Sequence, residues 1–234
     1  MDLSGKVLVV TGADGALGQA VAATLSGYGA KLALLSHAAL RADIGEAKPQ
    51  AGAWRYGGID LTLETATRPA MERIVRDAGR IDGLINVAGG FRFENVSAGT
   101  IDSWDAMYKL NLRTAVISCQ AALPYLLRSA SGRIVNVGAL GALKAAAGMG
   151  PYAASKAGVA QLTEALAEEL KDRGITVNAI LPSTLDTPKN RLDMPKADFK
   201  RWVTLSEAAQ VIAFLVSDQA SAVTGALIPV VGRV

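Results

Sequence analysis

Short apolar runs alternate along the chain with longer segments in which apolar residues recur at helical spacing. The runs are rich in Val, Ile and Leu and predict strands at Lys6–Val10, Lys31–Leu35, Trp54–Ile59, Gly83–Val87, Arg133–Val137, Thr176–Ile180 and Ala226–Val230. The segments between them predict helices near Ala16–Ser26, Leu63–Ala78, Ile101–Leu127, Tyr152–Lys171 and Ser206–Val216. Strands that alternate with helices and are apolar on both faces form parallel sheets, so we expect one doubly wound α/β domain over residues 1–234.

Two helix ends and one long segment add detail to this pattern. Ser206 followed by Glu207 predicts an N-cap, and Gly174 predicts the end of the preceding helix. The segment Pro182–Arg201 shows neither periodicity and contains several prolines. Unpatterned stretches of this length inside compact domains are often functional, so we expect residues 182–201 to form a substrate-side loop or lid. The alternative interpretation is a disordered surface loop.

Composition narrows the possible partners. The chain has 234 residues, half of them apolar, and a net charge of +3 without a cluster of Lys or Arg, so we expect no nucleic-acid partner. No uncharged stretch reaches the ~20 residues of a membrane helix, and no charged-then-apolar leader precedes the first strand. We therefore expect a cytoplasmic protein without membrane association. The single Cys119 is expected to be a buried small hydrophobe rather than a nucleophile.

Glycines concentrate at the junction between the first strand and the first helix. The sequence there is Thr11-Gly-Ala-Asp-Gly-Ala-Leu-Gly18. Glycines in this position permit a tight turn and allow a pyrophosphate to approach the N-terminus of the helix. The turn predicts a dinucleotide site in a Rossmann-type fold.

Tyr152 and Lys156 lie four residues apart at the start of a predicted helix, which places them on one helical face. A cation beside a phenol lowers the pKa of the phenol, so the pair is typical of a general acid or base. Taken alone, such a pair on a helix is more often a solvated surface pair.

Together these motifs resemble a short-chain dehydrogenase/reductase over the stretch from about Leu3 to Gly232. The residues that carry the resemblance are Thr11-Gly12 with Gly18, Asp60, Asn86-Val-Ala-Gly89, Asn111, Tyr152 with Lys156, and Asn178-Ala-Ile-Leu-Pro182. The resemblance implies a nicotinamide cofactor, NAD(P)(H), bound at the carboxyl ends of the strands. It places Gly12, Leu17 and Gly18 under the pyrophosphate, Asp60 and Leu61 near the adenine, Asn86, Ala88 and Gly89 along the ribose, and Pro182, Leu185 and Thr187 at the nicotinamide.

The resemblance also implies roles in catalysis. Tyr152 is expected to donate the proton during reduction, and Lys156 to hold the nicotinamide ribose and depress the pKa of Tyr152. Asn111 is expected to anchor a water that links Lys156 to solvent. Family members pair the helices corresponding to 101–127 and 152–171 across two-fold axes, which implies a homodimer or homotetramer.

One position departs from the family pattern. Family members carry a serine about thirteen residues before the tyrosine, where its hydroxyl polarises the substrate carbonyl, but this chain has Ala139. Loss of one such donor costs ~10²–10³ in rate when charge develops on an oxygen. The stretch from Gly138 to Tyr152 resembles that of dihydropteridine reductases, which also have Ala there and reduce an electron-poor conjugated ring. The other interpretation of Ala139 is loss of activity.

The end of the second strand bears on the choice between NAD and NADP. Ser36 and His37 offer no carboxylate for a ribose 2′-hydroxyl, whereas Ser36, His37 and Arg41 suit a 2′-phosphate. Asp14 in the glycine turn opposes a phosphate, and His37 is alternatively an exposed loop residue. We favour NADP(H). No second His or Cys cluster lies near His37, so no metal site is expected.

The substrate is expected to be a small molecule. Ala139, Met149, Phe91 and Trp202 are candidates for lining its site, although Phe91 is alternatively a loop hydrophobe and Trp202 a packing anchor. Three hypotheses remain: an oxidoreductase acting on a conjugated imine or quinonoid ring such as a dihydropterin, a ketone or alcohol oxidoreductase that works without the serine, and an NAD(P)-binding sensor or scaffold without turnover. The presence of Tyr152, Lys156 and Asn111 together argues against the third.

Overall fold

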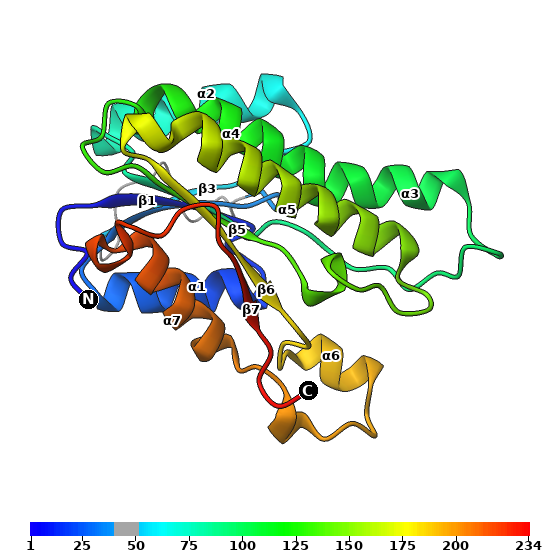
Figure 1. Cartoon of the computed structure of the whole chain (residues 1–234). Coiled ribbons are helices and arrows are strands. Elements are labelled where there is room, and N and C mark those ends of the chain that lie inside the picture. Colours follow the sequence, from blue (N-terminus) through cyan, green and yellow to red (C-terminus); the bar gives the residue numbers. More distant parts are fainter. Residues whose placement is uncertain (40–51) are drawn as a thin grey trace.

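A parallel sheet forms the centre of the computed structural model, which describes residues 1–39 and 52–234 (Figure 1). Within these residues the strands are β1 (Val7–Thr11), β2 (Lys31–Leu35), β3 (Ala53–Tyr56), β4 (Gly83–Asn86), β5 (Arg133–Val137), β6 (Thr176–Pro182) and β7 (Leu227–Val230). They lie in the order β3-β2-β1-β4-β5-β6-β7, and every neighbouring pair is parallel. The chain builds outward from β1 to β3 and then returns to place β4 on the other side of β1. Ligands of such sheets bind outside the carboxyl ends of the strands at this reversal.

Helices cover both faces of the sheet (Figure 1). The helices are α1 (Ala16–Gly27), α2 (Glu64–Ala78), α3 (Ile101–Met107), α4 (Thr114–Leu126), α5 (Gly150–Leu170), α6 (Pro188–Asp193) and α7 (Leu205–Val216). α1 and α7 pack together on one face, and α2, α4 and α5 lie on the other. The predicted doubly wound α/β domain is confirmed.

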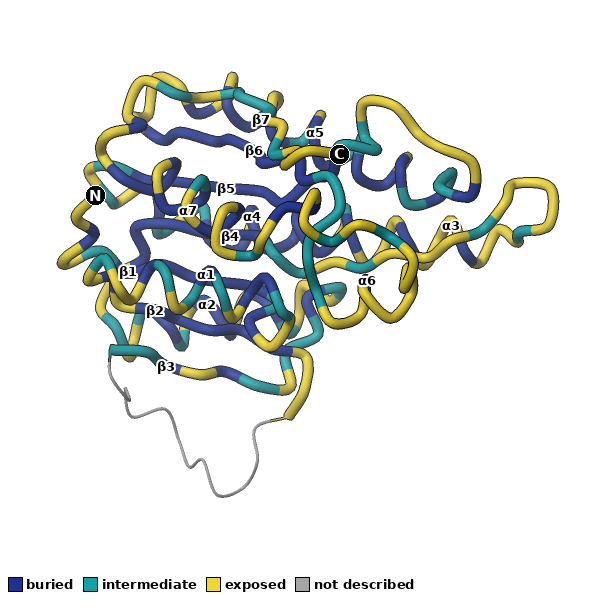
Figure 2. The backbone as a smooth tube through the Cα atoms, turned by 90° about the horizontal axis from the view of Figure 1, so that it is seen from below, coloured by how far each residue is buried: buried dark blue, intermediate teal, exposed yellow. Residues whose placement is uncertain are grey.

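Alternation of side chains within the strands divides the core into two clusters. In β1, Leu8 and Val10 belong to the cluster under α1 and α7, whereas Val9 between them belongs to the cluster under α2, α4 and α5. A strand whose side chains alternate between two covered faces must be apolar throughout. The buried strands and the exposed outer sides of the helices are visible in Figure 2. Cys119 lies in the second cluster, and burial raises the pKa of its thiol to about 12.

Several predicted boundaries need correction. The third strand ends at Tyr56 rather than at Ile59, and α5 begins at Gly150, before Tyr152, with Pro151 in its first turn. α7 is capped by Thr204 rather than by Ser206, because the Thr204 side chain and Glu207 form a reciprocal capping box. Gly174 does end its helix, in the left-handed conformation with a φ of 69°.

The helix predicted as continuous from Ile101 to Leu127 is interrupted. Residues Tyr108–Arg113 between α3 and α4 form a π-helical segment. A π-helical turn accommodates extra backbone and often marks a functional position in a helix. Apolar periodicity does not reveal such a turn, because the chain remains helical from α3 through the π-helical segment to α4 and only the hydrogen-bonding pattern changes.

Residues 182–201 are structured rather than irregular. They contain α6 and a 3₁₀ turn at Phe199–Arg201. Asp186 and Arg191 form an ion pair through both carboxylate oxygens, at 2.6 and 2.7 Å, and the Arg191 guanidinium lies over the ring of Phe199. Phe199 in turn packs against Trp202 with ring centroids 4.8 Å apart. These contacts contradict the interpretation of a disordered loop.

Candidate functional site

The glycine turn after β1 is bonded to the loop after β4. The Thr11 hydroxyl oxygen accepts hydrogen bonds from the backbone N–H groups of Val87 and Ala88, both at 3.1 Å. The two loops thereby form one surface at the position where the strand order reverses. This is the position at which the fold type binds its ligands.

The turn itself has the shape of a dinucleotide cradle. Gly12 has a φ of 62°, and a Cβ atom there would lie 2.8 Å from the Ala88 Cα. A Cβ on Gly18 would lie 2.3 Å from the Gly12 carbonyl oxygen, so only glycine allows the turn to close against α1. No described side chain caps the N-terminus of α1 at Gly15, which leaves the first backbone N–H groups of α1 for an anion. These residues fit a pyrophosphate.

The residues predicted around the adenosine differ in exposure. Ser36 is buried at the end of β2 and donates its hydroxyl to the Ala38 carbonyl, whereas His37 and Asp14 are exposed. The Asp60 carboxylate accepts hydrogen bonds from the hydroxyl and the backbone N–H of Thr62, which hold its pKa below the usual range. Leu61 beside it is buried. Arg41 lies outside the described residues.

Asn86 turns its side chain into the protein interior. Its Nδ2 atom donates to Asn136 Oδ1 at 2.9 Å and contacts Cys119 Sγ at 3.3 Å. A role for Asn86 at the ribose, which stays a prediction, therefore falls to its backbone. Gly89 lies further along the same loop, where a Cβ atom would stand 2.7 Å from Asn111 Oδ1 and 3.2 Å from Lys156 Nζ.

Asn111 lies in the π-helical segment and is 1% exposed. Its Oδ1 atom accepts from the Gly90 N–H at 2.9 Å, and its Nδ2 atom donates to the Gly90 carbonyl at 3.1 Å and to Ser155 Oγ at 3.0 Å. The Ser155 hydroxyl donates to the Tyr152 carbonyl at 2.7 Å. We call Asn111, Tyr152, Ser155 and Lys156 the polar network.

The charges in the polar network are set by burial. Lys156 is 5% exposed and donates to the Val137 carbonyl at 2.7 Å, and burial lowers the pKa of its ammonium to about 8. Burial also raises the pKa of Tyr152 to about 12. Burial is the cause of this shift in the structure, and the expected lowering of the Tyr152 pKa by Lys156 stays a prediction. A phenol with a pKa this high stays protonated at neutral pH, which is the form that can donate a proton.

The side of the site that faces the polar network carries no hydroxyl from the loop after β5. Ala139 is 5% exposed and precedes the 3₁₀ turn Leu140–Ala142. The Met149 side chain reaches Gly141 in this turn, where its methyl carbon lies 3.0 Å from the position of a Cβ atom. Phe91 meets the ring of Tyr152 edge to face, with centroids 4.9 Å apart, and remains 51% exposed. We call Phe91, Ala139, Leu140 and Met149 the apolar wall.

The remaining predicted residues lie in and after β6. Pro182 ends β6 and is buried, Leu185 forms an isolated bridge with Val203, and the Thr187 hydroxyl caps α6 by accepting from the Asn190 N–H. Trp202 is buried against Phe199, as the packing interpretation expects. The structure does not bring Trp202 into contact with Tyr152 through any described interaction, and its role toward a substrate stays a prediction.

Sequence reasoning missed two members of the site. Ser155 lies between Tyr152 and Lys156 in sequence, and its spacing of three from Tyr152 was a usable signal. Gly90, which holds Asn111 through its backbone, gave no signal, because any residue type can supply a backbone N–H and a backbone carbonyl.

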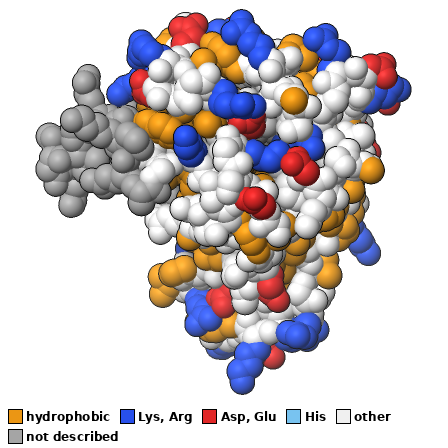
Figure 3. Space-filling model, turned by 90° about the vertical axis from the view of Figure 1, so that its left-hand side faces the viewer, with side chains coloured by type: hydrophobic (Ala, Val, Ile, Leu, Met, Phe, Trp, Pro, Cys, Tyr) orange, Lys and Arg blue, Asp and Glu red, His pale blue; other side chains and the backbone are white. Residues whose placement is uncertain are grey.

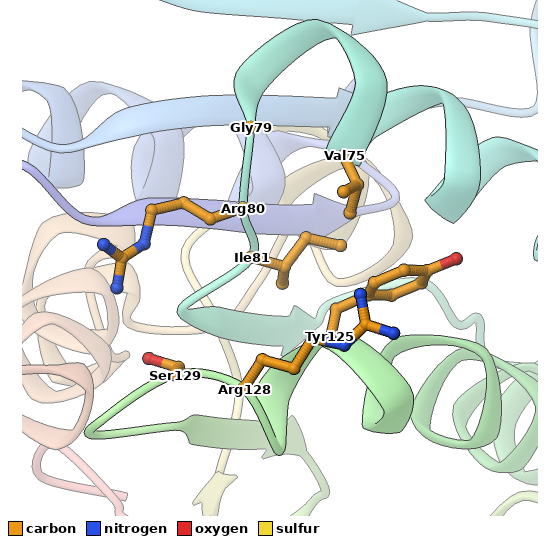
Figure 4. A pocket seen from close by; sticks show the side chains of 7 residues that line it. All are labelled: Val75, Gly79, Arg80, Ile81, Tyr125, Arg128 and Ser129. Atoms are coloured by element: carbon orange, nitrogen blue, oxygen red, sulfur yellow. The ribbon is translucent and has the colours of Figure 1, made fainter.

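The cavity in Figure 4 belongs to another part of the molecule. It has a volume of about 300 Å³ and is lined by Val75, Gly79, Arg80, Ile81, Tyr125, Arg128 and Ser129. Residues 79–81 lead into the amino end of β4, so the cavity lies away from the carboxyl ends of the strands. Figure 3 views the molecule from the end where the strands begin, and basic and acidic side chains are interspersed there.

Residues 1–39 and 52–234 contain no group of three or more His, Cys, Asp or Glu side chains arranged to hold a metal ion. Within the same residues, none of the helices combines the length and the apolar character needed to cross a membrane.

Comparison with known proteins agrees with this geometry. Residues 6–197 match the family model of the short chain dehydrogenases. The chain is 34% identical to the 3-oxoacyl-[acyl-carrier-protein] reductase FabG of Thermotoga maritima, with 99% of this chain and 98% of the relative covered. The FabG protein of Pseudomonas aeruginosa is also 34% identical, with the same coverage.

A solved structure gives the same result. The 3-ketoacyl-(acyl-carrier-protein) reductase of Brucella melitensis, crystallised with NADH, superposes with a TM-score of 0.85 at 27% identity, covering 99% of this chain and 98% of that one. The resemblance to the short-chain dehydrogenases/reductases is confirmed, and the resemblance of the stretch from Gly138 to Tyr152 to dihydropteridine reductases stays a prediction. The chain belongs to the short-chain dehydrogenase family of NAD(P)-dependent oxidoreductases.

Proposed function

We propose that this oxidoreductase reduces a conjugated imine or quinonoid ring, such as a dihydropterin, with Tyr152 as the proton donor. The observation that carries the proposal is the contrast between two sides of one site. All four residues of the polar network are present, with Asn111 bonded to Ser155 and Lys156 to the Val137 carbonyl, whereas the position at which the family carries the serine holds the buried Ala139.

A conjugated ring suits this contrast. Polarisation of an isolated ketone requires a donor to the oxygen on which charge develops. A quinonoid ring is already electron-poor and spreads the added electron pair over several atoms, so it depends less on such a donor. The exposed face of Phe91 beside Tyr152 offers a planar apolar contact to a flat ring.

The reduction adds one hydride and one proton to the substrate. When bound, the nicotinamide cofactor supplies the hydride and is oxidised by two electrons. Tyr152 gives its Oη proton to the nitrogen or oxygen at the other end of the conjugated system. Lys156 stabilises the resulting phenolate, and the proton returns from solvent along a path that Asn111 holds open.

The variant Ala139→Ser tests this proposal. NAD(P)H oxidation is followed at 340 nm with quinonoid dihydropterin and with a panel of small ketones. We expect turnover of the pterin by the unmodified protein, and a change of less than about threefold in the variant, because the ring needs no further donor. Turnover of ketones alone by the unmodified protein would contradict the proposal.

A ketoreductase of 3-oxoacyl substrates is the second candidate. It is favoured by the full-length similarity to 3-oxoacyl-[acyl-carrier-protein] reductases. In that case acetoacetyl thioesters are reduced, and Ala139→Ser raises their turnover by about 10²-fold, the reverse of the loss on removing such a donor. Tight cofactor binding without reduction of any of these substrates would instead favour the sensor or scaffold.

We also propose that NADP(H) is preferred over NAD(H). No carboxylate stands at the end of β2, where Ser36 is buried and His37 is exposed. The variant His37→Asp introduces a carboxylate that repels a 2′-phosphate and accepts a ribose hydroxyl. We expect the ratio of the NADPH and NADH dissociation constants, measured by cofactor fluorescence, to shift toward NADH by about tenfold or more.

Residues 182–201 and the helices at 101–127 and 152–171 complete the proposal. We assign residues 182–201 to the covering of the substrate side, with Pro182, Leu185 and Thr187 near the nicotinamide. We assign self-association as a homodimer or homotetramer to the two helical regions, of which the first exposes the hydrophobic residues Ile101, Trp104, Tyr108 and Leu110. Light scattering after size exclusion measures the oligomer, and a monomer would contradict this part.

A further inference from the structure

A buried serine joins the π-helical segment to the helix that carries Tyr152. Ser155 is 4% exposed and lies one helical turn after Tyr152, directly before Lys156. Its hydroxyl makes two hydrogen bonds with opposite roles. It accepts from Asn111 Nδ2 at 3.0 Å and donates to the Tyr152 carbonyl at 2.7 Å.

One of these bonds has a local explanation and the other does not. Serines inside helices commonly donate to a carbonyl of the preceding turn, which accounts for the bond to Tyr152. The bond from Asn111 crosses between elements 44 residues apart. In residues 1–39 and 52–234, no other hydrogen bond between side chains joins Tyr108–Arg113 to α5.

The same bond decides how Asn111 is oriented. Each amide hydrogen of Asn111 Nδ2 has one close oxygen, the Gly90 carbonyl for one and Ser155 Oγ for the other. Without Oγ, the remaining neighbour of the second hydrogen is Met107 Sδ at 3.9 Å, a weak acceptor. Rotation of the Asn111 amide toward any other partner would also release the Gly90 N–H from Oδ1.

We propose that Ser155 is a positioning residue for proton transfer. By fixing the Asn111 amide, it holds the Gly90 loop on one side and the turn of α5 with Tyr152 and Lys156 on the other. The proposal rests on the proposed roles of Tyr152 and Asn111 in the reaction. It assigns no contact between Ser155 and the substrate.

The chain offers a matched set of variants. Ser155→Ala removes the hydroxyl, and Ser155→Thr restores a hydroxyl at the same position. Ser118→Ala is the control, because Ser118 is an equally buried serine in α4 whose hydroxyl has no hydrogen-bond partner among the described residues. Thermal unfolding of each variant shows whether the fold is retained.

The first measurement needs no substrate. Hydrogen exchange of the Gly90 N–H is followed by NMR, because this group donates to Asn111 Oδ1. We expect exchange to accelerate by about tenfold in Ser155→Ala, through local opening. Ser155→Thr restores the protection, and Ser118→Ala leaves it unchanged. Unaltered protection of Gly90 in a folded Ser155→Ala protein would overturn the proposal.

The second measurement is kinetic, with quinonoid dihydropterin and NADPH, or an acetoacetyl thioester if that substrate is the one reduced. Positioned proton transfer contributes ~10²–10⁴ to a rate, and a misplaced relay retains part of it, so we expect kcat to fall by about tenfold in Ser155→Ala. The KM values stay within about twofold, and the solvent isotope effect on kcat rises. A rise in KM with unchanged kcat and isotope effect would also overturn the proposal.

The variant Tyr152→Phe separates the two proposals. If it abolishes turnover while Ser155→Ala matches the unmodified protein, Tyr152 keeps its role and the inference about Ser155 fails. If Tyr152→Phe retains full turnover, the proposed function itself fails, and only the exchange of Gly90 then decides whether Ser155 positions Asn111.

Discussion

The polar network and the apolar wall are built from neighbouring parts of one site but differ in burial and in hydrogen bonding. In the polar network, the side chains of Asn111, Ser155 and Lys156 are buried and hydrogen-bonded to fixed partners. The apolar wall contributes no side-chain hydrogen bond, and its Phe91 is about half exposed. A buried polar group must be satisfied or it destabilises the fold, whereas an apolar surface tolerates many partners.

This difference indicates how the two sides divide the reaction. The polar network can serve proton transfer only in one arrangement, so it constrains the chemistry. In the proposed function, the apolar wall selects a substrate by shape and by the absence of a hydroxyl at Ala139. The absence of a hydroxyl on one side, with Asn111, Tyr152, Ser155 and Lys156 all present on the other, is what the proposed substrate would require, because such a ring needs a proton more than it needs polarisation.

Tyr152→Phe is expected to have the largest effect and tests the polar network. Removal of the proton donor lowers kcat by about 10³-fold in a steady-state assay. The Tyr152 hydroxyl makes no hydrogen bond with any described residue, so the free energy of unfolding is expected to change by less than about 0.5 kcal/mol. Cofactor affinity measured by fluorescence serves as the control. Turnover within tenfold of the unmodified protein would remove Tyr152 from the mechanism.

The next largest effect is expected from the titration of Lys156, which makes the free energy of unfolding depend on pH. Its pKa is about 8 in the folded protein and near 10.5 in an unfolded chain, so between these values the unfolded state binds more protons. Stability therefore rises with pH across this window, by on the order of 3 kcal/mol from this group. This gain in stability is absent below pH 8, where Lys156 is charged in both the folded and the unfolded state and the folded protein must bury the ammonium.

Denaturant unfolding at several pH values between 8 and 10.5 measures this contribution. The slope in the unmodified protein is compared with that of Lys156→Met, in which the titrating group is absent. Other titrating groups contribute equally to both proteins and cancel in the difference. Parallel slopes would show that Lys156 keeps an ordinary pKa, which would contradict the effect of burial on the polar network.

The two sides also differ in how far the sequence predicts them. Local patterns predict the parallel sheet, the glycine turn and the position of Tyr152 beside Lys156. Strands, turns and helical spacing can be recognised from residues that are close together in the sequence. Asn111 was predicted only through the family resemblance. Its bonds to Gly90 and Ser155 depend on a π-helical turn and on contacts across long sequence separations, which no local periodicity encodes.

The pKa of Tyr152 shows the same limit. The spacing of Tyr152 and Lys156 predicts attraction between phenolate and ammonium, but the depth of burial that raises the Tyr152 pKa is a property of the whole fold. The apolar wall was predicted in part, since Ala139, Met149 and Phe91 were identified by position. The edge-to-face contact of Phe91 with Tyr152 required the structure.

Phe91→Leu is expected to have the smallest effect and tests the apolar wall. Leucine remains apolar but offers no aromatic face to a flat substrate ring, and an aromatic pair is worth about 0.5–1.5 kcal/mol beyond burial. We expect the KM for quinonoid dihydropterin to rise by roughly three- to tenfold, with kcat within about twofold, because the wall contributes to binding rather than to proton transfer.

Phe93→Leu is the matched control for this prediction. Phe93 lies two residues further along the same loop and is 65% exposed, but its ring contacts Gly148 rather than Tyr152. Leucine at position 93 is therefore expected to leave both constants unchanged. Equal increases in KM for the two variants would mean that the loop acts through its general apolar character. A fall in kcat confined to Phe91→Leu would mean that Phe91 orients the Tyr152 ring, and the division between an apolar wall for binding and a polar network for proton transfer would then be wrong at this residue.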